Sequence, residues 1–244
     1  MTDAAKTFSL DRASRSGTCA PGRGRRHTMY VLGKGFGRFV FSVAMNVHTI
    51  NPEIVDRDGP FVVACTHLSH LDPFCVSILV RRPVEWLARK EFYKYGWSRW
   101  LLNSLGCIKV NRQGIPVSTI REAIARLNEG RIIGICPDGG VAIGADAAMR
   151  RGPIKRGVSS VAIHANVPIV PCVTLGTHKF NRIMPWLPIK SAHLYVAYGQ
   201  PIQPPAAKST RASRLELTER LRDSFNDLYQ QLLAQYSLRD ADMP

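Results

Sequence analysis

The chain has 244 residues, 45% of them hydrophobic, so it can bury a core as one large domain or two small ones, and one domain is the simpler interpretation. Its 33 Lys and Arg residues exceed its 18 Asp and Glu residues, and the net charge of +15 indicates a polyanionic partner: nucleic acid, an anionic membrane or a phosphorylated substrate. The six cysteines form no C-x-x-C pair, which argues against a cysteine zinc site or a thioredoxin-like motif and fits core residues in a reducing compartment.

The N-terminal region differs in composition from the rest. Residues 1–28 contain Gly, Ser, Pro and Arg without the continuous apolar run of a secretory signal, and we predict a disordered basic arm there. Residues 29–50 are apolar, but Lys34, Arg38 and three glycines interrupt them, so they fall short of a clean span of about 20 apolar residues. A helix at a membrane interface and a helix packed on its own domain both fit this pattern. We predict a membrane-interface helix over 29–50, followed by a folded domain over 51–244.

From residue 51 onward, short β-branched runs alternate with segments of helical period. The predicted strands are 61–66, 84–88, 107–110, 131–136, 168–175 and 192–199. The predicted helices between them are 71–80, 90–104, 117–128 and 154–166. This alternation predicts an α/β fold with a central, largely parallel sheet flanked by helices.

The C-terminal segment, residues 211–236, has a clear amphipathic pattern. Charged residues occupy one face, and the opposite face carries Leu217, Leu221, Phe225, Leu228 and Leu232. We predict a C-terminal amphipathic helix that packs on the core.

The stretch "CTHLSHLDPF" places two histidines and an aspartate directly after the first predicted strand of the domain. If the strand ends before His67 and the helix begins before Asp72, the turn between them folds the carboxylate back onto the imidazole. A carboxylate on one ring nitrogen raises the basicity of the other, as a general base requires. Two alternatives stay open: Asp72 caps the helix, or His67 and His70 bind a metal with a third ligand from elsewhere.

Two later strands also end in polar residues. The segment "GCIKVNR" ends in Arg112, which can grip a phosphate bidentately or be an ordinary solvated arginine. The segment "CPDGG" forms a tight turn in which the amides of Gly139 and Gly140 can approach a ligand and Asp138 points into the same cleft, although a plain turn would use the same residues.

Taken in order, "THLSHLD", "GCIKVNR", "CPDGG" and "IKRGVSSVAIHANVPIVPCVTLG" resemble the glycerolipid acyltransferase family typified by 1-acylglycerol-3-phosphate acyltransferase. That family carries an NHxxxxD motif, a G-x-I-x-x-x-R segment, an FPEGTRS-like turn and a late V-P-I-V-P strand in the same order. The resemblance covers about residues 60–176, and it identifies 51–244 as an acyltransferase domain.

The resemblance implies transfer of a fatty acyl group from acyl-CoA or acyl carrier protein to the hydroxyl of a lysophospholipid such as 1-acylglycerol-3-phosphate, in phospholipid biosynthesis or remodelling. It implies that His67 is the general base, that Asp72 orients it, and that Arg112 binds the phosphate or another anionic headgroup. The other substrate-binding residues that it implies are Asp138, Gly139, Gly140, Lys155 and Pro168. It implies no metal and no cofactor apart from the acyl donor as co-substrate.

The chain departs from the family pattern at three places. Thr66 stands where the family has Asn, Asp138 replaces Glu, and "GGVAI" replaces the Gly-Thr-Arg-Ser that supplies a phosphate-binding arginine. The basic residues nearby that can substitute for that arginine are Arg150, Arg151, Lys155 and Arg156. The acceptor therefore stays open among lysophosphatidic acid, another lysolipid and an unusual hydroxylated acceptor.

The segment "FYKYGWSRW" mixes aromatic and basic residues in the way favoured at a lipid interface, although the aromatics can also pack as core. Together with the positive charge, it predicts a peripheral or monotopic protein on an anionic membrane surface, at the cytoplasmic face. Two rivals remain: a non-catalytic lipid-binding protein of the same fold and a basic nucleic-acid-binding protein. We expect no nucleic-acid partner, because the sequence has no recognised helix-turn-helix, zinc finger or RNP motif.

Overall fold

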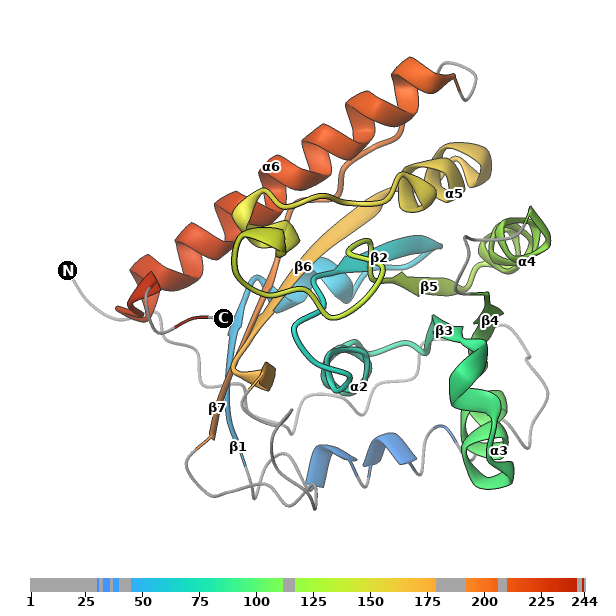
Figure 1. The fold of residues 1–244 in the computed structure, drawn as a ribbon, viewed down its shortest axis with the longest axis horizontal. Helices are drawn as coiled ribbons and strands as arrows, with labels where there is room; N and C mark the ends of the chain where they lie inside the picture. The colour runs from blue at the N-terminus through green and yellow to red at the C-terminus, as the bar shows by residue number, and fades with distance from the viewer. Residues whose placement is uncertain are drawn as a thin grey trace.

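The structure is a computed structural model that describes residues 30, 33–35, 37–39, 45–111, 117–178, 192–205, 210–240 and 243. These residues build one central sheet in the order β1-β7-β6-β2-β5-β3-β4 (Figure 1). The strands are β1 (Met45–Ile50), β2 (Phe61–Cys65), β3 (Val84–Arg89), β4 (Ile108–Val110), β5 (Ile132–Ile135), β6 (Ile169–Leu175) and β7 (Ala192–Tyr198). Neighbouring strands run parallel except β6 and β7, which pair antiparallel. The predicted α/β fold with a largely parallel sheet is confirmed.

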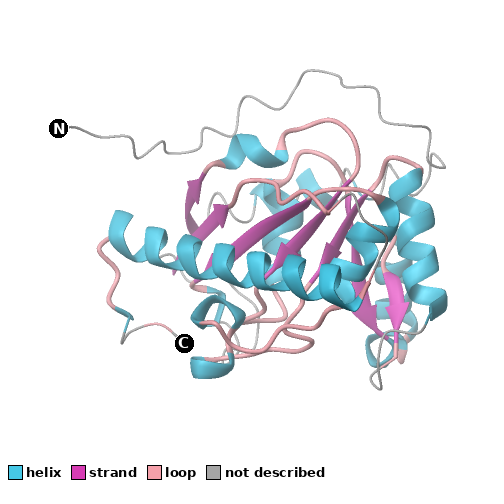
Figure 2. Ribbon diagram, turned by 90° about the horizontal axis from the view of Figure 1, so that it is seen from above, coloured by secondary structure: helices cyan, strands magenta, loops and turns pink. Residues whose placement is uncertain are grey.

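Helices cover both faces of the sheet (Figures 1 and 2). The α-helices are α2 (Asp72–Leu79), α3 (Gly96–Ser104), α4 (Val117–Asn128), α5 (Gly157–Ala165) and α6 (Arg211–Gln235). Short 3-10 turns are η2 (Pro52–Val55), η3 (Lys90–Tyr93), η4 (Gly144–Asp146) and η5 (Ala148–Arg150). Helices α4, α5 and α6 lie on one face, and α2 lies on the other.

Strand β2 lies in the middle of the sheet and shows why the short apolar runs of this chain form strands. All five of its residues are buried, and alternate side chains point to opposite faces. Val62 and Ala64 pack in the core under α4, α5 and α6, whereas Phe61 and Val63 pack in the core under α2. A short, fully apolar run with β-branched residues therefore marks a central parallel strand.

Helix α6 confirms the amphipathic prediction for the C-terminal segment. The five apolar residues predicted for its inner face are all buried: Leu217, Leu221, Phe225, Leu228 and Leu232. Its start is fixed by a capping box, in which the Thr210 hydroxyl accepts from the Ser213 amide at 3.0 Å and the Ser213 hydroxyl accepts from the Thr210 amide at 2.9 Å.

The prediction of one helix over 29–50 is wrong in its last part. Residues 45–50 form strand β1, which pairs in parallel with β7 from Met45 opposite Ala192 to Ile50 opposite Ala197. The segment "MNVHTI" contains three β-branched residues, which fit a sheet, but its partner lies about 150 residues later and no local pattern shows that pairing. The sheet therefore begins before residue 51. The predicted basic arm, 1–28, lies outside the described residues.

The described residues before β1 are helical and contact the domain. The Tyr30 ring is buried, and its hydroxyl accepts a hydrogen bond from the Val84 amide at 3.2 Å. The Lys34 ammonium donates to the carbonyls of Val80 and Arg81, just past the end of α2. Phe39, in contrast, is 66% exposed. The helix packs on its own domain through one side and leaves an aromatic side chain outside. Among the described helices, none combines the length and the apolar character that crossing a bilayer requires.

Candidate active site

The carboxyl ends of β2, β5 and β3 meet at one edge of the sheet, since these strands are parallel neighbours. His67 lies two residues after β2, and Asp72 is the first residue of α2. His67 Nδ1 lies 3.5 Å from Asp72 Oδ2; the His67 side chain is 14% exposed and the Asp72 side chain is fully buried. The geometry brings together the two residues predicted as base and orienting acid and leaves the imidazole partly accessible.

The Asp72 carboxylate is held by groups from two elements. Its Oδ2 accepts a hydrogen bond from the Ser69 amide at 2.7 Å, and its Oδ1 accepts one from the Thr174 hydroxyl on β6 at 2.9 Å. These bonds offset the free-energy cost of burying a carboxylate. The N-cap residue of α2 is Leu71, with no side-chain cap, so the alternative in which Asp72 caps the helix is not what the structure shows.

Thr66, which stands where the family has Asn, belongs to the same buried network. Its amide donates to the Cys172 carbonyl at 3.1 Å, and its hydroxyl accepts from the Thr174 amide at 3.3 Å. Thr66 thus joins the end of β2 to β6 at Thr174, the same residue whose hydroxyl holds Asp72. With Thr at this position, the pairing of His67 with Asp72 is in place.

Asp138 follows β5 and lies near His67. Its Oδ1 accepts from the Ala148 amide at 3.0 Å, whereas its buried Oδ2 has no hydrogen-bond partner in the described part of the chain. Burial raises the pKa of the Asp138 carboxyl to about 6, and the hydrogen bond from Ala148 and the charge of His67 oppose that rise. The loop that follows this turn contacts the backbone of His67: the Ala142 amide donates a hydrogen bond to the His67 carbonyl at 2.9 Å.

Two cations flank the glycine turn after Asp138. Gly139 has a φ of +77°, and a Cβ atom there would lie 2.5 Å from Lys155 Nζ. At Gly140, a Cβ atom would lie 2.8 Å from Arg89 Nη2, which donates to the Gly139 carbonyl at 2.9 Å. The two glycines therefore let a lysine and an arginine approach the backbone. Lys155 was predicted near the site, whereas Arg89 was missed.

The other predicted basic substitutes point elsewhere. The Arg150 guanidinium contacts Asp240 at 3.2 Å and the Tyr229 hydroxyl at 3.1 Å, and Arg151 pairs with Asp223 at 2.6 Å. These partners belong to α6 and the segment after it. Arg156 is exposed at the N-cap of α5. Of the four substitutes predicted for the missing arginine, the structure brings Lys155 to the turn.

Pro168 lies apart from the described site. Pro168 precedes β6, and its carbonyl accepts from the Val62 amide at 3.0 Å, so it lies at the opposite end of the sheet. Four residues at about 3.3 Å each separate it by roughly 13 Å from Cys172, which pairs with Cys65 at the site edge. The structure therefore places Pro168 at the end of the strand away from His67, and its predicted role in substrate binding stays a prediction. Arg112 lies outside the described residues.

The remaining candidates for metal binding or covalent chemistry are His70 and the thiols. The rings of His67 and His70 are 5.9 Å apart, and the described residues contain no group of three or more His, Cys, Asp or Glu side chains that could hold a metal. Burial raises the pKa of the thiols of Cys65, Cys75 and Cys136, so they are protonated near neutral pH and are poor nucleophiles. The pairing of His67 with Asp72 is an arrangement that can transfer a proton.

Comparisons with known proteins show the family of the chain. The acyltransferase family model matches residues 46–175, more than half of the chain. The 1-acyl-sn-glycerol-3-phosphate acyltransferase of Bacillus subtilis (strain 168) is 25% identical over 200 residues, 79% of this chain and 95% of that protein. The enzyme of the same name from Escherichia coli (strain K12) is 28% identical over 157 residues, 62% of this chain and 61% of that protein.

A solved structure shares the fold. The crystal structure of the 1-acyl-sn-glycerophosphate (LPA) acyltransferase PlsC from Thermotoga maritima superposes with a TM-score of 0.64 at 20% identity, and the match covers 85% of this chain and 84% of that one. The family match, the order of the motifs and the fold lead to one assignment. The chain belongs to the acyltransferase family, among its PlsC-like glycerolipid members.

Proposed function

We propose that the protein transfers a fatty acyl group from a thioester, acyl-CoA or acyl carrier protein, to the hydroxyl of a lysophospholipid in phospholipid biosynthesis or remodelling. The observation that carries this proposal is the partly exposed His67 imidazole, paired with buried Asp72 and placed beside a turn flanked by two cations. A base, an orienting acid and an anion-binding edge are the three parts that acylation of a phosphorylated lipid alcohol needs.

In the proposed reaction, His67 Nε2, the ring nitrogen that does not face Asp72, takes the proton of the acceptor hydroxyl. At the same time, the oxygen of that hydroxyl attacks the thioester carbonyl. Asp72 keeps the ring oriented and stabilises the imidazolium. The tetrahedral intermediate then collapses, the carbon–sulfur bond breaks, and the imidazolium returns the proton to the thiolate. The products are an ester and a free thiol, and no covalent enzyme intermediate is required.

The acceptor that best suits this edge of the site carries a phosphate, and 1-acylglycerol-3-phosphate is the simplest such lipid. Arg89 and Lys155 reach the same turn from β3 and from the segment before α5, so their charges converge where a headgroup can lie. The Oδ2 of Asp138, which has no hydrogen-bond partner among the described residues, can accept a hydrogen bond from a hydroxyl of the acceptor. Arg112 is expected to add a third cation.

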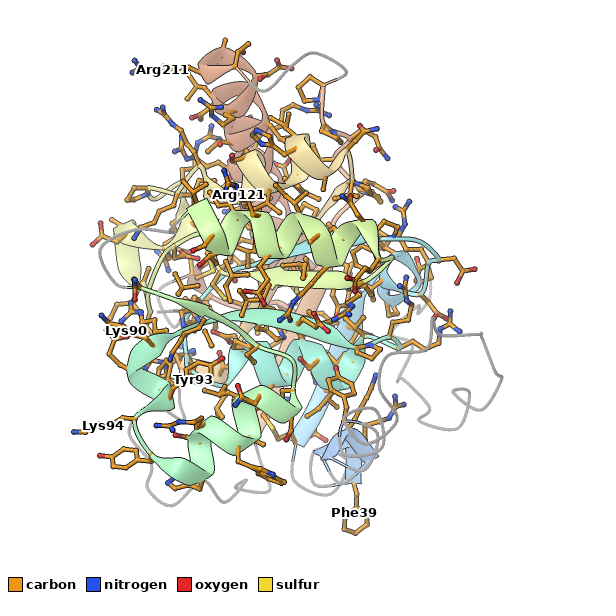
Figure 3. All side chains as sticks on the ribbon, turned by 90° about the vertical axis from the view of Figure 1, so that its right-hand side faces the viewer. Phe39, Lys90, Tyr93, Lys94, Arg121 and Arg211 are labelled. Atoms are coloured by element: carbon orange, nitrogen blue, oxygen red, sulfur yellow. The ribbon has the colours of Figure 1, made fainter. Side chains whose placement is uncertain are left out.

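The outer surface of α3 supports peripheral binding to an anionic membrane. Ser98 is the buried residue of this helix, whereas Trp97 is 70% exposed and Trp100 is 57% exposed. Exposed Lys90 and Lys94 lie just before the helix. Figures 1 and 3 both place α3 along the same side of the molecule as the N-terminal helical residues, where the exposed Phe39 lies. Aromatic and basic side chains in this mixture suit the headgroup region, and we propose the cytoplasmic leaflet.

The test is acyl transfer by the purified full-length chain on anionic vesicles, from labelled acyl-CoA and acyl carrier protein, with a panel of lysolipids. The wild type is expected to release thiol and form a diacyl product with 1-acylglycerol-3-phosphate. His67→Ala is expected to lower the rate about 10²- to 10⁴-fold without unfolding. Lipid binding without turnover from either donor, unchanged in His67→Ala, would identify a lipid-binding protein instead.

A further inference from the structure

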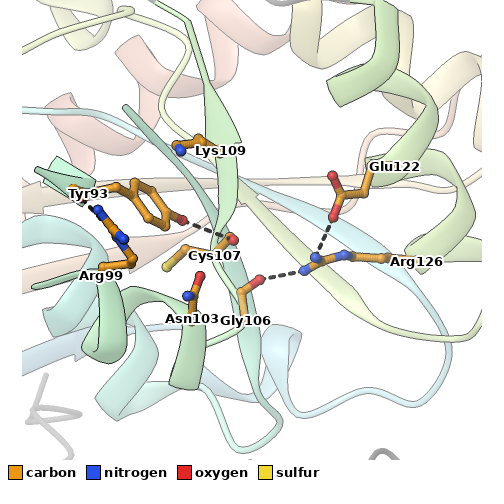
Figure 4. A pocket seen from close by; sticks show the side chains of 8 residues that line it. All are labelled: Tyr93, Arg99, Asn103, Gly106, Cys107, Lys109, Glu122 and Arg126. Carbon is orange, nitrogen blue, oxygen red and sulfur yellow. Dashed lines mark hydrogen bonds and ion pairs between the residues drawn. The ribbon is translucent and has the colours of Figure 1, made fainter. Parts of the chain in front are cut away.

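Hydrogen-bonded networks of polar side chains lie at two places in the sheet. The first lines a cavity of about 320 Å³ between α3, β4 and α4 (Figure 4). There the Tyr93 hydroxyl donates to the Cys107 carbonyl at 3.1 Å. The Arg126 guanidinium donates to the Gly106 carbonyl and contacts the Glu122 carboxylate at 2.5 Å. These contacts join η3 and α4 to the segment that leads into β4, which is three strands from β2 in the sheet order.

The second network begins where β2 ends. The Thr66 amide continues the parallel pairing with β6 and donates to the Cys172 carbonyl at 3.1 Å. In an evenly spaced parallel ladder, the next hydrogen bond runs from the Thr174 amide to the Thr66 carbonyl. The observed acceptor is instead the Thr66 hydroxyl, at 3.3 Å. The side chain of Thr66 therefore extends the ladder by one step, while the backbone leaves the sheet for the loop that carries His67.

The hydroxyl of Thr174 holds the carboxylate that pairs with the base. The side chains of Thr66, Thr174 and Asp72 are all buried. Because an ionised carboxylate only accepts hydrogen bonds, the Thr174 hydroxyl donates its hydrogen to Asp72 Oδ1, at 2.9 Å. The other oxygen, Oδ2, accepts from the Ser69 amide at 2.7 Å and lies 3.5 Å from His67 Nδ1. The two donors thus decide which carboxylate oxygen faces the imidazole.

The Thr174 hydroxyl also limits rotation of the Asp72 carboxylate. The χ2 torsion of an aspartate is broad, so its neighbours must fix it. Without this hydroxyl, Oδ1 loses the one donor that the described residues supply to it, and the carboxylate can turn about its contact with the Ser69 amide. A histidine whose partner has turned can hold its proton on Nε2 instead of Nδ1, and that tautomer cannot accept a proton at Nε2.

We propose that Thr174 is a positioning residue: its hydroxyl turns the Asp72 carboxylate so that the His67 imidazole keeps its proton on Nδ1 and its lone pair on Nε2. Thr66, which stands where the family has Asn, fixes the backbone of Thr174 and acts through it. The proposal rests on the acyl-transfer function proposed above and adds to it the residue that orients the partner of the base.

The first test is steady-state acyl transfer by the full-length chain with substitutions at Thr174. Thr174→Val and Thr174→Ala each remove a hydrogen bond to a charged group, so kcat should fall about 10- to 100-fold. The KM values for both substrates should stay within about twofold of the wild type, because Thr174 contacts Asp72 and is not placed against substrate. The alanine leaves no methyl group against the carboxylate, so agreement between the two variants excludes a steric clash as the cause. Thr174→Ser keeps the hydroxyl and should recover kcat to within about threefold.

The matched control is Thr218→Val on α6. The Thr218 hydroxyl is buried and lies 2.8 Å from the Ser159 hydroxyl, so its loss should lower the free energy of unfolding without changing kcat by more than about twofold. Circular dichroism confirms that each variant is folded. A kcat in Thr174→Val and Thr174→Ala equal to that of the control would overturn the proposal, and so would a Thr174→Ser variant as slow as Thr174→Ala.

The second test reads the tautomer of His67 and needs no turnover. Nitrogen NMR of the full-length chain, labelled at its histidine rings, distinguishes a protonated ring nitrogen from an unprotonated one, and His67→Gln identifies the signals. The wild type should carry the proton on Nδ1, and Thr174→Ala should show a mixture of tautomers. A wild-type proton on Nε2, or an unchanged tautomer in Thr174→Ala, would overturn the proposal. The expected mixture in a chain that transfers acyl groups to no acceptor would support the positioning role and contradict the proposed function.

Discussion

The site around Asp72 and the surface of α3 both reverse the usual placement of polar and apolar side chains, in opposite directions. In the site, a carboxylate is fully buried and is held by a backbone amide, a hydroxyl and a histidine. On α3, a serine is buried while two tryptophans are exposed. Helix α6 shows the ordinary arrangement, with its leucines and Phe225 inside. The two reversals cost stability, so we interpret them as functional: one for proton transfer and one for contact with lipid.

The largest expected effect is in the buried half of this comparison. Asp72→Asn keeps the shape of the side chain but removes the charge that orients and stabilises the His67 imidazolium, and kcat should fall about 10²- to 10⁴-fold. The measurement is steady-state acyl transfer, with circular dichroism to confirm folding. Asp56→Asn removes a carboxylate from a surface ion pair with Arg81 and serves as the matched control. A kcat in Asp72→Asn equal to that of the control would show that the buried charge has no catalytic role.

The next prediction concerns the cost of burying Asp138. The folded-state pKa of about 6 lies above the ordinary value of 3.8, so the folded state keeps a proton that the unfolded state loses between about pH 4 and pH 6. Stability should fall as the pH rises through this window and then level off, with a total loss of up to about 3 kcal/mol. The Asp138→Asn variant lacks the titrating carboxyl, so its stability should not fall in this way as the pH rises.

In urea unfolding, Asp138→Asn should therefore exceed the wild type in free energy of unfolding by up to about 3 kcal/mol at pH 8 and by almost nothing at pH 4. Asp146→Asn, on exposed η4, is the control and should change the free energy by less than about 0.5 kcal/mol. A constant difference between Asp138→Asn and the wild type from pH 4 to pH 8 would mean that the Asp138 carboxyl does not titrate in this window.

The exposed half of the comparison predicts a smaller effect on a different property. The double variant Trp97→Ala, Trp100→Ala should bind anionic vesicles about tenfold more weakly, while its free energy of unfolding changes by less than about 0.5 kcal/mol. Leu221→Ala on α6 should do the reverse: it should cost about 2–5 kcal/mol of stability and leave the vesicle affinity of the folded protein unchanged. Sedimentation with vesicles and urea unfolding separate the two. A large loss of stability in the tryptophan variant would make α3 part of the core.

Local patterns predicted the elements that carry most of the fold and part of the site. Each predicted strand is present with its ends within one residue, and the stripe of α6 and the spacing of His67 and Asp72 lead to the observed contacts. These features could be predicted because each depends on residues within one short segment: the period of a helix or strand, or the turn between His67 and Asp72.

The features that the sequence did not reveal depend on pairing between distant segments. Thr174 holds Asp72 across 102 positions, and β1 pairs with β7 across about 150, so neither contact has a local pattern. Arg89 was different, because it ends a parallel strand beside the site. The rule that drew attention to Arg112, a basic residue at a strand end, would have found Arg89 as well.

The most direct test of the central claim compares a phosphorylated acceptor with a neutral one. The measurement is kcat/KM for 1-acylglycerol-3-phosphate divided by kcat/KM for the corresponding monoacylglycerol, in the wild type and in Arg89→Ala. We predict that the wild type favours the phosphorylated acceptor, and that Arg89→Ala lowers this ratio at least tenfold by slowing only the phosphorylated substrate. A ratio that Arg89→Ala leaves unchanged, or no transfer to either acceptor by the wild type, would contradict the account.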